Sequence, residues 1–354
     1  MTNYDLLDVI GQAQDQYILS AIRTRKQAAA FTPVKTRSTR GLLRKVLIAA
    51  AILSLLILTA CAAKYVGQLF STYFRQEHFA ELSDGQINYI EHNVQPSVAE
   101  PIITEAENGY SVTVRSALTD GKIAYITVDI QAPEGVNLEG GDIRFLENPL
   151  LFPEPAEGLV LAPDGSSPDA MCDYATVDDG DGRSNTASVM FKVNPFLENE
   201  NVMPFDGSIH WTMHAEGFEK SVFDMETMKF EETPLAEGIW EFDLTFQSID
   251  TRKVEFVAEP VSIITSDWIQ EEYVHENQIT SFALSGLSYW MELAQPEIDG
   301  ETQDVGDVAI VMKDGTQQTL IRLTAQSSSL SAPIILDEVD YILLSNGVKL
   351  QAPQ

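Results

Sequence analysis

The chain has 354 residues, 44% hydrophobic and 21% charged, a balance that excludes wholesale disorder. The net charge of −31 is unevenly distributed, because residues 1–45 carry +5 whereas the chain from Lys64 onward carries −36. So acidic a region repels nucleic acids and anionic surfaces, which excludes them as its partners. Cations, basic peptides and basic polymers remain as candidate ligands of this region. The alternative is that the negative charge serves only to keep the chain soluble.

Residues 1–45 predict a short amphipathic helix followed by a basic linker. Apolar side chains recur there at three- and four-residue steps, which places them in one stripe along a helix. The stripe comprises Leu6, Leu7, Ile10, Tyr17, Ile18 and Ile22. A helix this short has no core in which to bury the stripe, so we expect it to bind a groove of a cytoplasmic partner. The alternatives are that it lies on the membrane surface or that the segment is disordered.

Residues 46–63 predict one transmembrane helix. They are uncharged, and 18 helical residues extend about 27 Å, enough to cross a hydrocarbon core. Eight Lys and Arg residues precede the span, so the positive-inside rule places residues 1–45 in the cytoplasm and the rest outside the cell. Two alternatives also put the ectodomain outside, namely a lipoprotein modified at Cys61 and a secreted protein cleaved beside Ala62. Cys61 and Cys172 are not expected to pair, because one lies in the span.

The remainder predicts an ectodomain that begins with helices and continues with many strands. Residues 64–93 have helix-like spacing with a break at residues 83–85. Beyond Gly109 the apolar residues alternate, and Asp120 with Gly121 marks a tight hairpin between runs 110–117 and 123–130. Further alternating runs are 187–193, 208–214, 239–246, 253–257, 279–284, 289–293, 308–312, 319–323 and 339–344.

These runs predict a mainly β fold, with extracellular immunoglobulin-like β-sandwich domains in series. We expect a first extracellular domain over residues 64–255 and a C-terminal β domain over residues 256–354. Residues 131–186 are rich in Gly and Pro and predict a long irregular connection.

No pattern typical of catalysis is present, so we expect no enzyme, no cofactor and no metal. The acidic turn 178–182 resembles the start of a calcium loop, but the acid expected about twelve residues from the start is missing, which favours a solvated turn. His210 and His214 have the spacing of a helical zinc pair, yet the alternation around them predicts a strand.

Several short motifs suggest a family. Residues 4–11 read YDLLDVIG, residues 82–90 read LSDGQINYI, residues 109–114 read GYSVTV and residues 118–121 read LTDG. These motifs resemble anti-sigma-like single-pass membrane proteins of Gram-positive bacteria, which carry an ectodomain of unknown function and are often encoded beside extracytoplasmic-function (ECF) sigma factors. Gln16 stands where that family usually has a second acidic residue.

The resemblance implies a membrane-anchored signalling regulator. Its N-terminal stripe would bind an ECF sigma factor, and its ectodomain would sense or anchor an unknown extracellular ligand. It implies no catalytic residues, because the family has none assigned. The alternatives are a cell-surface binding or structural protein with no sigma-factor partner, and a lipoprotein-type ligand binder.

Overall fold

The computed structural model describes the part of the chain that was predicted to be the ectodomain. Its described residues are 64–96, 99–106, 109–147, 150–153, 170–178, 180, 182–195, 205, 207, 210–225, 227–247, 252–267, 274–320, 323–324 and 327–351. Described residues of 64–178 and 183–351 belong to one compact unit.

Two helices begin the described chain. Residues 64–78 are helical, and Phe79 follows with a left-handed φ of 52°. The second helix, α3 (Asp84–Asn93), starts with a capping box, in which the Ser83 hydroxyl accepts from the Gln86 N–H and the Gln86 side chain accepts from the Ser83 N–H. The predicted helical spacing is confirmed. The predicted break at residues 83–85 is wrong, because Ser83 caps the second helix and the gap lies at residues 79–82.

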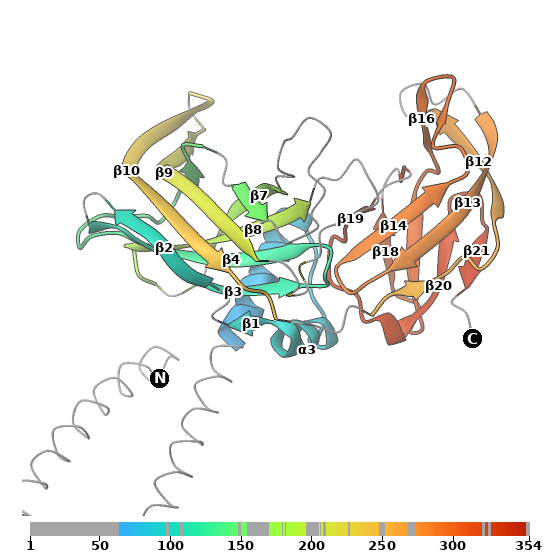
Figure 1. Ribbon diagram of the computed structural model, residues 1–354, viewed down its shortest axis with the longest axis horizontal. Coiled ribbons are helices and arrows are strands. Elements are labelled where there is room, and N and C mark those ends of the chain that lie inside the picture. Colours follow the sequence, from blue (N-terminus) through green and yellow to red (C-terminus); the bar gives the residue numbers. More distant parts are fainter. Residues whose placement is uncertain are drawn as a thin grey trace, which may run out of the picture. The chain divides into compact units, whose positions relative to one another are not determined.

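Strands β1 to β10 form the first module, an antiparallel sheet in the order β1-β3-β4-β8-β7-β6-β9-β10-β2, with β5 paired to β9 (Figure 1). Their bounds are β1 Gln95–Pro96, β2 Ala99–Ala106, β3 Ser111–Thr119, β4 Ala124–Gln131, β5 Asp142–Phe145, β6 Leu150–Pro153, β7 Ala170–Val177, β8 Thr186–Pro195, β9 Trp211–Asp224 and β10 Lys229–Leu244. The predicted hairpin is confirmed, since Thr119 of β3 pairs with Ala124 of β4.

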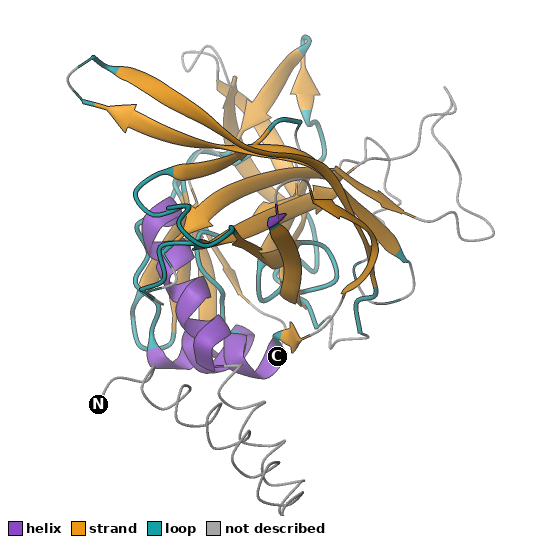
Figure 2. Ribbon diagram, turned by 90° about the vertical axis from the view of Figure 1, so that its left-hand side faces the viewer, coloured by secondary structure: helices purple, strands orange, loops and turns teal. Residues whose placement is uncertain are grey.

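Strand β4 is buried on both faces, which explains its almost continuous apolar sequence. Ile126 and Val128 belong to the main core of the first module, whereas Tyr125 faces the helices and contacts the rings of Phe70 and Phe74. Figure 2 shows the helices lying against one side of the strands. The helices therefore cover the outer face of the sheet and form a second layer of core.

Strands β11 to β21 form the second module, which has two sheets within the described residues. One has the order β15-β16-β12-β13-β14-β19 with β11 paired to β13, and the other has the order β18-β17-β20-β21. The bounds are β11 Val254–Glu255, β12 Val261–Asp267, β13 Val274–Leu284, β14 Ser288–Leu293, β15 Glu297–Ile298, β16 Glu301–Asp304, β17 Val308–Met312, β18 Gln317–Leu320, β19 Ser327–Ser329, a 3-10 turn Leu336–Glu338, β20 Val339–Leu344 and β21 Lys349–Gln351. Phe282 of the first sheet and Ile310 of the second belong to one core cluster, so the two sheets share a core.

The predicted irregular connection over residues 131–186 is wrong, because β5, β6 and β7 lie within it. Side chains rather than a backbone ladder join β5 to β7. The Tyr174 hydroxyl accepts from the Phe145 N–H at 3.0 Å, and the Thr176 hydroxyl accepts from the Ile143 N–H at 2.7 Å. Contacts of this kind leave no alternating pattern in the sequence.

Candidate functional site

The predicted partner-binding stripe lies outside the described residues, as does the predicted span 46–63. The stripe comprises Leu6, Leu7, Ile10, Tyr17, Ile18 and Ile22. Among the residues that the structure describes, none of the helices is long and apolar enough to cross a membrane. The described chain offers a different candidate site, where the two modules meet the helices. We call it the junction, formed by the β3–β4 turn (residues 119–123), the β13–β14 turn (residues 285–288) and α3.

Asp120 is the centre of the junction. Its side chain is buried, and one carboxylate oxygen accepts from the N–H groups of Lys122 and Ile123, both at 2.9 Å, which closes its own turn. The other oxygen accepts from the hydroxyls of Ser285 and Ser288 in the second module, the latter at 2.6 Å. A buried carboxylate is tolerated only when its oxygens are hydrogen-bonded, and this one is bonded to both modules.

The helices contribute two further contacts to the junction. The Gln86 side-chain amide donates a 2.6 Å hydrogen bond to the carbonyl of Pro333 in the second module. Tyr89 packs so closely on Gly286 that a Cβ added at this glycine would lie 2.0 Å from the tyrosine oxygen. Any larger residue at this position would have to displace the Tyr89 ring.

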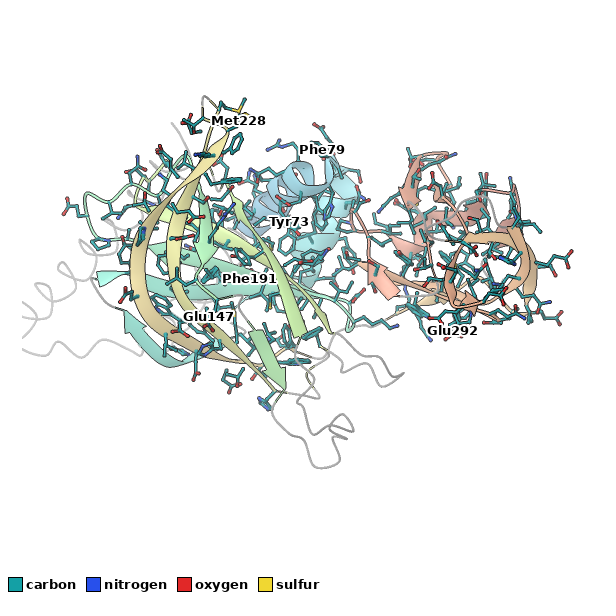
Figure 3. All side chains as sticks on the ribbon, turned by 90° about the horizontal axis from the view of Figure 1, so that it is seen from above. Tyr73, Phe79, Glu147, Phe191, Met228 and Glu292 are labelled. Carbon is teal, nitrogen blue, oxygen red and sulfur yellow. The ribbon has the colours of Figure 1, made fainter. Side chains whose placement is uncertain are left out.

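Residues 64–78 are packed from their first turn onward. Phe70 and Phe74 are fully buried, and they share a core cluster with Leu118 of the first module and Leu287 of the second. Phe79, just past the helix, is 92% exposed (Figure 3). The helix that follows the predicted span in sequence is therefore part of the folded core of both modules.

A cationic edge flanks the junction. The Lys122 ammonium lies 4.0 Å from the ring centre of Trp290, and the Lys253 ammonium lies 5.0 Å from it. Burial lowers the pKa of Lys122, and Lys253 adds to this, while the Asp120 charge opposes it. Trp290 holds both ammonium groups on its ring, which adds a cation–π contact between the modules.

A small cavity of about 240 Å³ opens at the junction. Its lining includes Tyr89, Asp120, Arg252, Gly286 and Ile335, which come from both modules and from α3. The oxygens of Asp120 already accept from four donors, so this carboxylate is fully hydrogen-bonded. Its bonds hold the two modules together at the junction.

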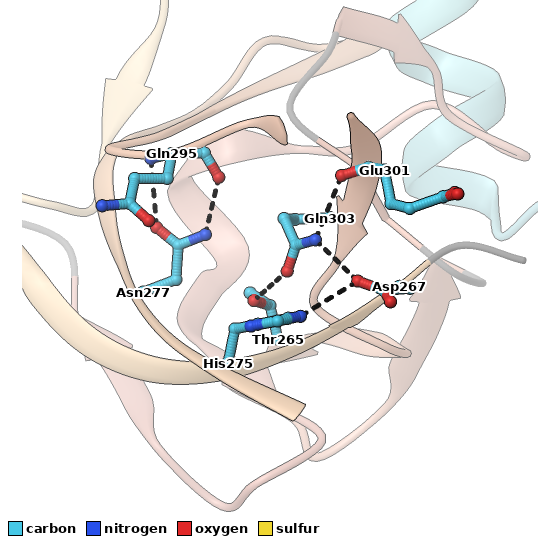
Figure 4. Close-up of polar contacts among 7 residues, drawn as sticks. All are labelled: Thr265, Asp267, His275, Asn277, Gln295, Glu301 and Gln303. Carbon is cyan, nitrogen blue, oxygen red and sulfur yellow. Dashed lines mark hydrogen bonds and ion pairs between the residues drawn. The ribbon is translucent and has the colours of Figure 1, made fainter. Parts of the chain in front are cut away.

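A second polar group occupies one end of the second module (Figure 4). Asp267 is buried and lies 3.2 Å from the His275 ring nitrogen, and it accepts from the Gln303 amide at 2.9 Å. Thr265 donates to the other end of that amide at 2.8 Å, and Asn277 and Gln295 bond each other. The Asp267 carboxylate therefore has the Gln303 amide and the His275 ring as partners, as a buried polar group requires.

A groove of about 580 Å³ lies beside this cluster. Its walls include Ile264, Glu276 and Gln295, one apolar, one charged and one polar side chain. Within the described residues, no group of three or more His, Cys, Asp or Glu side chains is placed to hold a metal.

The two weaker sequence candidates also have places in the structure. His214 lies on β9, where a strand was predicted, and its Nδ1 atom is 2.9 Å from Glu241 on β10. His210 lies 3.6 Å from Asp243. In the acidic turn, Gly180 and Gly182 both have left-handed φ, while Asp179 and Asp181 lie outside the described residues.

Sequence reasoning marked the Asp120–Gly121 turn only as a hairpin. A motif that would identify its buried role does not exist, because the two serines that complete it lie 165 and 168 residues away. The sequence therefore does not predict that these residues meet at one site.

No protein-family model matches the chain, and no curated protein matches it. One solved structure, described as the conserved domain protein from Bacillus anthracis, aligns with 70% of this chain and 76% of its own length. The identity is 15% and the TM-score 0.38, values that carry no argument about function.

Proposed function

We propose that this chain is a membrane-anchored signalling regulator of the anti-sigma-like kind. Its N-terminal stripe binds an ECF sigma factor in the cytoplasm, residues 46–63 cross the membrane, and the β-rich ectodomain senses or anchors an extracellular ligand.

One observation carries the proposal. The helical residues 64–78 follow the predicted span in sequence, and the Phe70 and Phe74 side chains are fully buried among residues of both modules. An ectodomain tethered only for display needs no such packing, since a flexible linker would suffice. A packed helix at this position supports a coupling between ligand binding outside and the membrane segment.

The proposal includes immunoglobulin-like sandwiches in series as the finer fold assignment. In its favour, Phe282 and Ile310 come from two different sheets of the second module and share one core. An experimental structure tests this assignment through the strand order of each sheet.

The cytoplasmic contact is tested on the full chain. The tagged protein is expressed in membranes with an ECF sigma factor encoded beside its gene, and co-purification of the factor is measured. Leu7→Asp combined with Ile18→Asp places two charges in the apolar stripe and is expected to reduce recovery on the order of tenfold or more. The matched control, Arg37→Gln with Arg40→Gln, changes the linker only and is expected to leave recovery unchanged.

Recovery of the sigma factor with the wild type and its loss with the stripe variant support the regulator. If the wild type recovers no sigma factor, or if the stripe variant recovers as much as the wild type, the alternative of a cell-surface binding or structural protein replaces it.

A further inference from the structure

The hairpin of β9 and β10 extends beyond the rest of its sheet. Among the described strands, β5 pairs with β9 only as far as Ser221, and β2 pairs with β10 only from Gly238 onward. Among the described residues, Val222–Asp224 and Lys229–Glu231 pair only with each other, so the hairpin ends as a two-stranded ribbon. A two-stranded ribbon in water is marginally stable at best, and one that persists needs side-chain contacts of its own.

Four large apolar side chains gather at the end of this ribbon. Phe223 is 40% exposed, Met225 77%, Met228 70% and Phe230 51%. We call these four residues the hairpin-end patch. Figure 3 shows Met228 at the end of the β9–β10 hairpin. Isolated exposed apolar residues are ordinary, but four of them at one hairpin end are a group of the kind found at interaction surfaces.

The patch is ordered by contacts within it. Phe223 and Phe230 are direct cross-strand partners, with ring centres 5.0 Å apart. The Arg144 guanidinium lies 4.4 Å from the Phe230 ring centre and 3.6 Å from Glu232. Ordering the aromatic pair in advance lowers the entropy cost of binding a partner. The two methionines add flexible apolar surface of the kind that adapts to different partners.

The surroundings of the patch select its partner by charge. Residues 216–237 contain seven acidic and two basic side chains, a net charge of −5. A second copy would bring the same charge to the contact, and an anionic bilayer would also repel it. A cationic surface is attracted, so the patch favours a ligand that is apolar on one side and basic on the other.

The edge of β10 next to the ribbon disfavours a partner that adds a strand. Pro234 offers no N–H, and the register shifts twice between Pro234 and Ile239. Proline and bulges of this kind block pairing at a sheet edge. Recognition must therefore use side chains, as an amphipathic helix does when its apolar stripe meets methionine and phenylalanine.

We propose that the hairpin-end patch binds cationic amphipathic peptide segments. The apolar face of the peptide covers Met225, Met228 and the aromatic pair, and its Lys or Arg side chains meet the acidic side chains of residues 216–237. This binding does not depend on the cytoplasmic partner, so it stands or fails independently of the sigma-factor contact.

The test uses the full chain in nanodiscs of zwitterionic lipid, and empty nanodiscs serve as the blank. The probe is a fluorescent Leu–Lys peptide designed as an amphipathic helix, and its anisotropy gives the Kd. A scrambled peptide of the same composition removes the amphipathic face, and a Leu–Glu peptide reverses the charge.

Two double variants separate the patch from the rest of the surface. Met225→Gln with Met228→Asn removes half of the patch, and asparagine suits the φ of 55° at position 228. The control, Ile264→Thr with Val274→Thr, removes two exposed apolar side chains from the second module. A third variant, Glu231→Gln with Glu237→Gln, removes two charges and no apolar surface.

The Leu–Lys peptide is expected to bind, and the methionine variant to weaken binding about tenfold or more, while the control binds like the wild type. The charge variant is expected to weaken binding severalfold at low salt and to flatten its salt dependence. A photoreactive version of the peptide, used on the wild type, should cross-link within residues 222–230 even if a variant fails to fold.

Other results overturn the proposal. These are equal binding of the scrambled or Leu–Glu peptide, an unchanged Kd in a folded methionine variant, and cross-links confined to other parts of the chain. A wild-type dimer that the methionine variant converts to a monomer would show instead that a second copy covers the patch.

Discussion

Asp120 and Ser288 are 168 residues apart in the chain, yet the serine hydroxyl donates a 2.6 Å hydrogen bond to the aspartate carboxylate. Because the same carboxylate closes its own turn, Asp120→Ala leaves the buried Ile123 N–H unpaired. It also removes the shared acceptor of the two serine hydroxyls, which keep only each other and the Ser288 carbonyl. We expect a loss of roughly 2–4 kcal/mol in the free energy of unfolding, measured by chemical denaturation.

The control for this variant is Asp314→Ala, in another turn closed by an aspartate. Bonds from the Thr316 hydroxyl and N–H lower the pKa of Asp314, but its carboxylate is exposed to water. We expect a much smaller change than at Asp120. Equal losses in the two variants would show that Asp120 matters only to its own turn.

Phe74 in the helix at residues 64–78 and Phe79 just past its end form a matched pair. Phe74 is fully buried and Phe79 is 92% exposed. Phe74→Ala is expected to destabilise the protein by about 3–5 kcal/mol, the usual cost of removing a buried aromatic side chain. Phe79→Ala should leave the thermal midpoint nearly unchanged. Similar midpoints in both variants would contradict the packing of this helix in the core.

His78 should make stability depend on pH. Its pKa is lowered from 6.5, chiefly by burial and also by the Lys192 charge, and its Nε2 atom has no hydrogen-bond partner within the described residues. Below about pH 6.5, His78 of the unfolded chain binds a proton that His78 of the folded chain does not. The free energy of unfolding therefore falls as the pH falls. The loss grows until the pH reaches the folded pKa and is constant below it.

His78→Phe keeps the ring contacts with Tyr73 and Phe74 and removes the titration. The difference in thermal midpoint between variant and wild type should therefore widen between about pH 7.5 and about pH 5.5. Phe79→Ala, which changes an exposed side chain and no titratable group, is the control and should show no such widening. A constant difference for His78→Phe would refute the assignment.

Cys172 should be nearly inert in the folded protein. Burial raises the pKa of its thiol to about 12, and the Asp173 charge adds to this effect. With Cys61→Ser as background, alkylation at about pH 8 should be roughly a thousandfold slower in the folded than in the unfolded chain, because the thiolate is the reacting form. Comparable rates, with and without denaturant, would place the thiol at the surface.

The sequence predicted the elements whose stabilising contacts are local. The β3–β4 hairpin follows from alternation around Asp120 and Gly121. The start of α3 was misread as a break, although the Ser83–Gln86 spacing is that of a capping box. The alternating runs at 289–293 and 308–312 coincide with β14 and β17. Short-range patterns carry this information because the side chains involved are neighbours in the chain.

The remaining elements depend on distant partners. The outer half of β10 was missed because its residues near Lys229 to Pro234 are exposed on both faces and show no alternation. Its turn lacks glycine, and Met228 adopts the left-handed φ instead. The junction was missed for a related reason, since Asp120 gains its role only when the β13–β14 turn is placed against it.

The amide of Gln86 bonds at both of its ends. Its oxygen caps α3 by accepting from Ser83, and its nitrogen donates to the Pro333 carbonyl. Glutamate caps helices as well as glutamine does, but an ionised carboxylate has no proton to offer a carbonyl. Glutamate and glutamine are interchangeable at most helix starts, but here only glutamine can make both bonds. The requirement comes from the Pro333 carbonyl, 247 positions further along the chain.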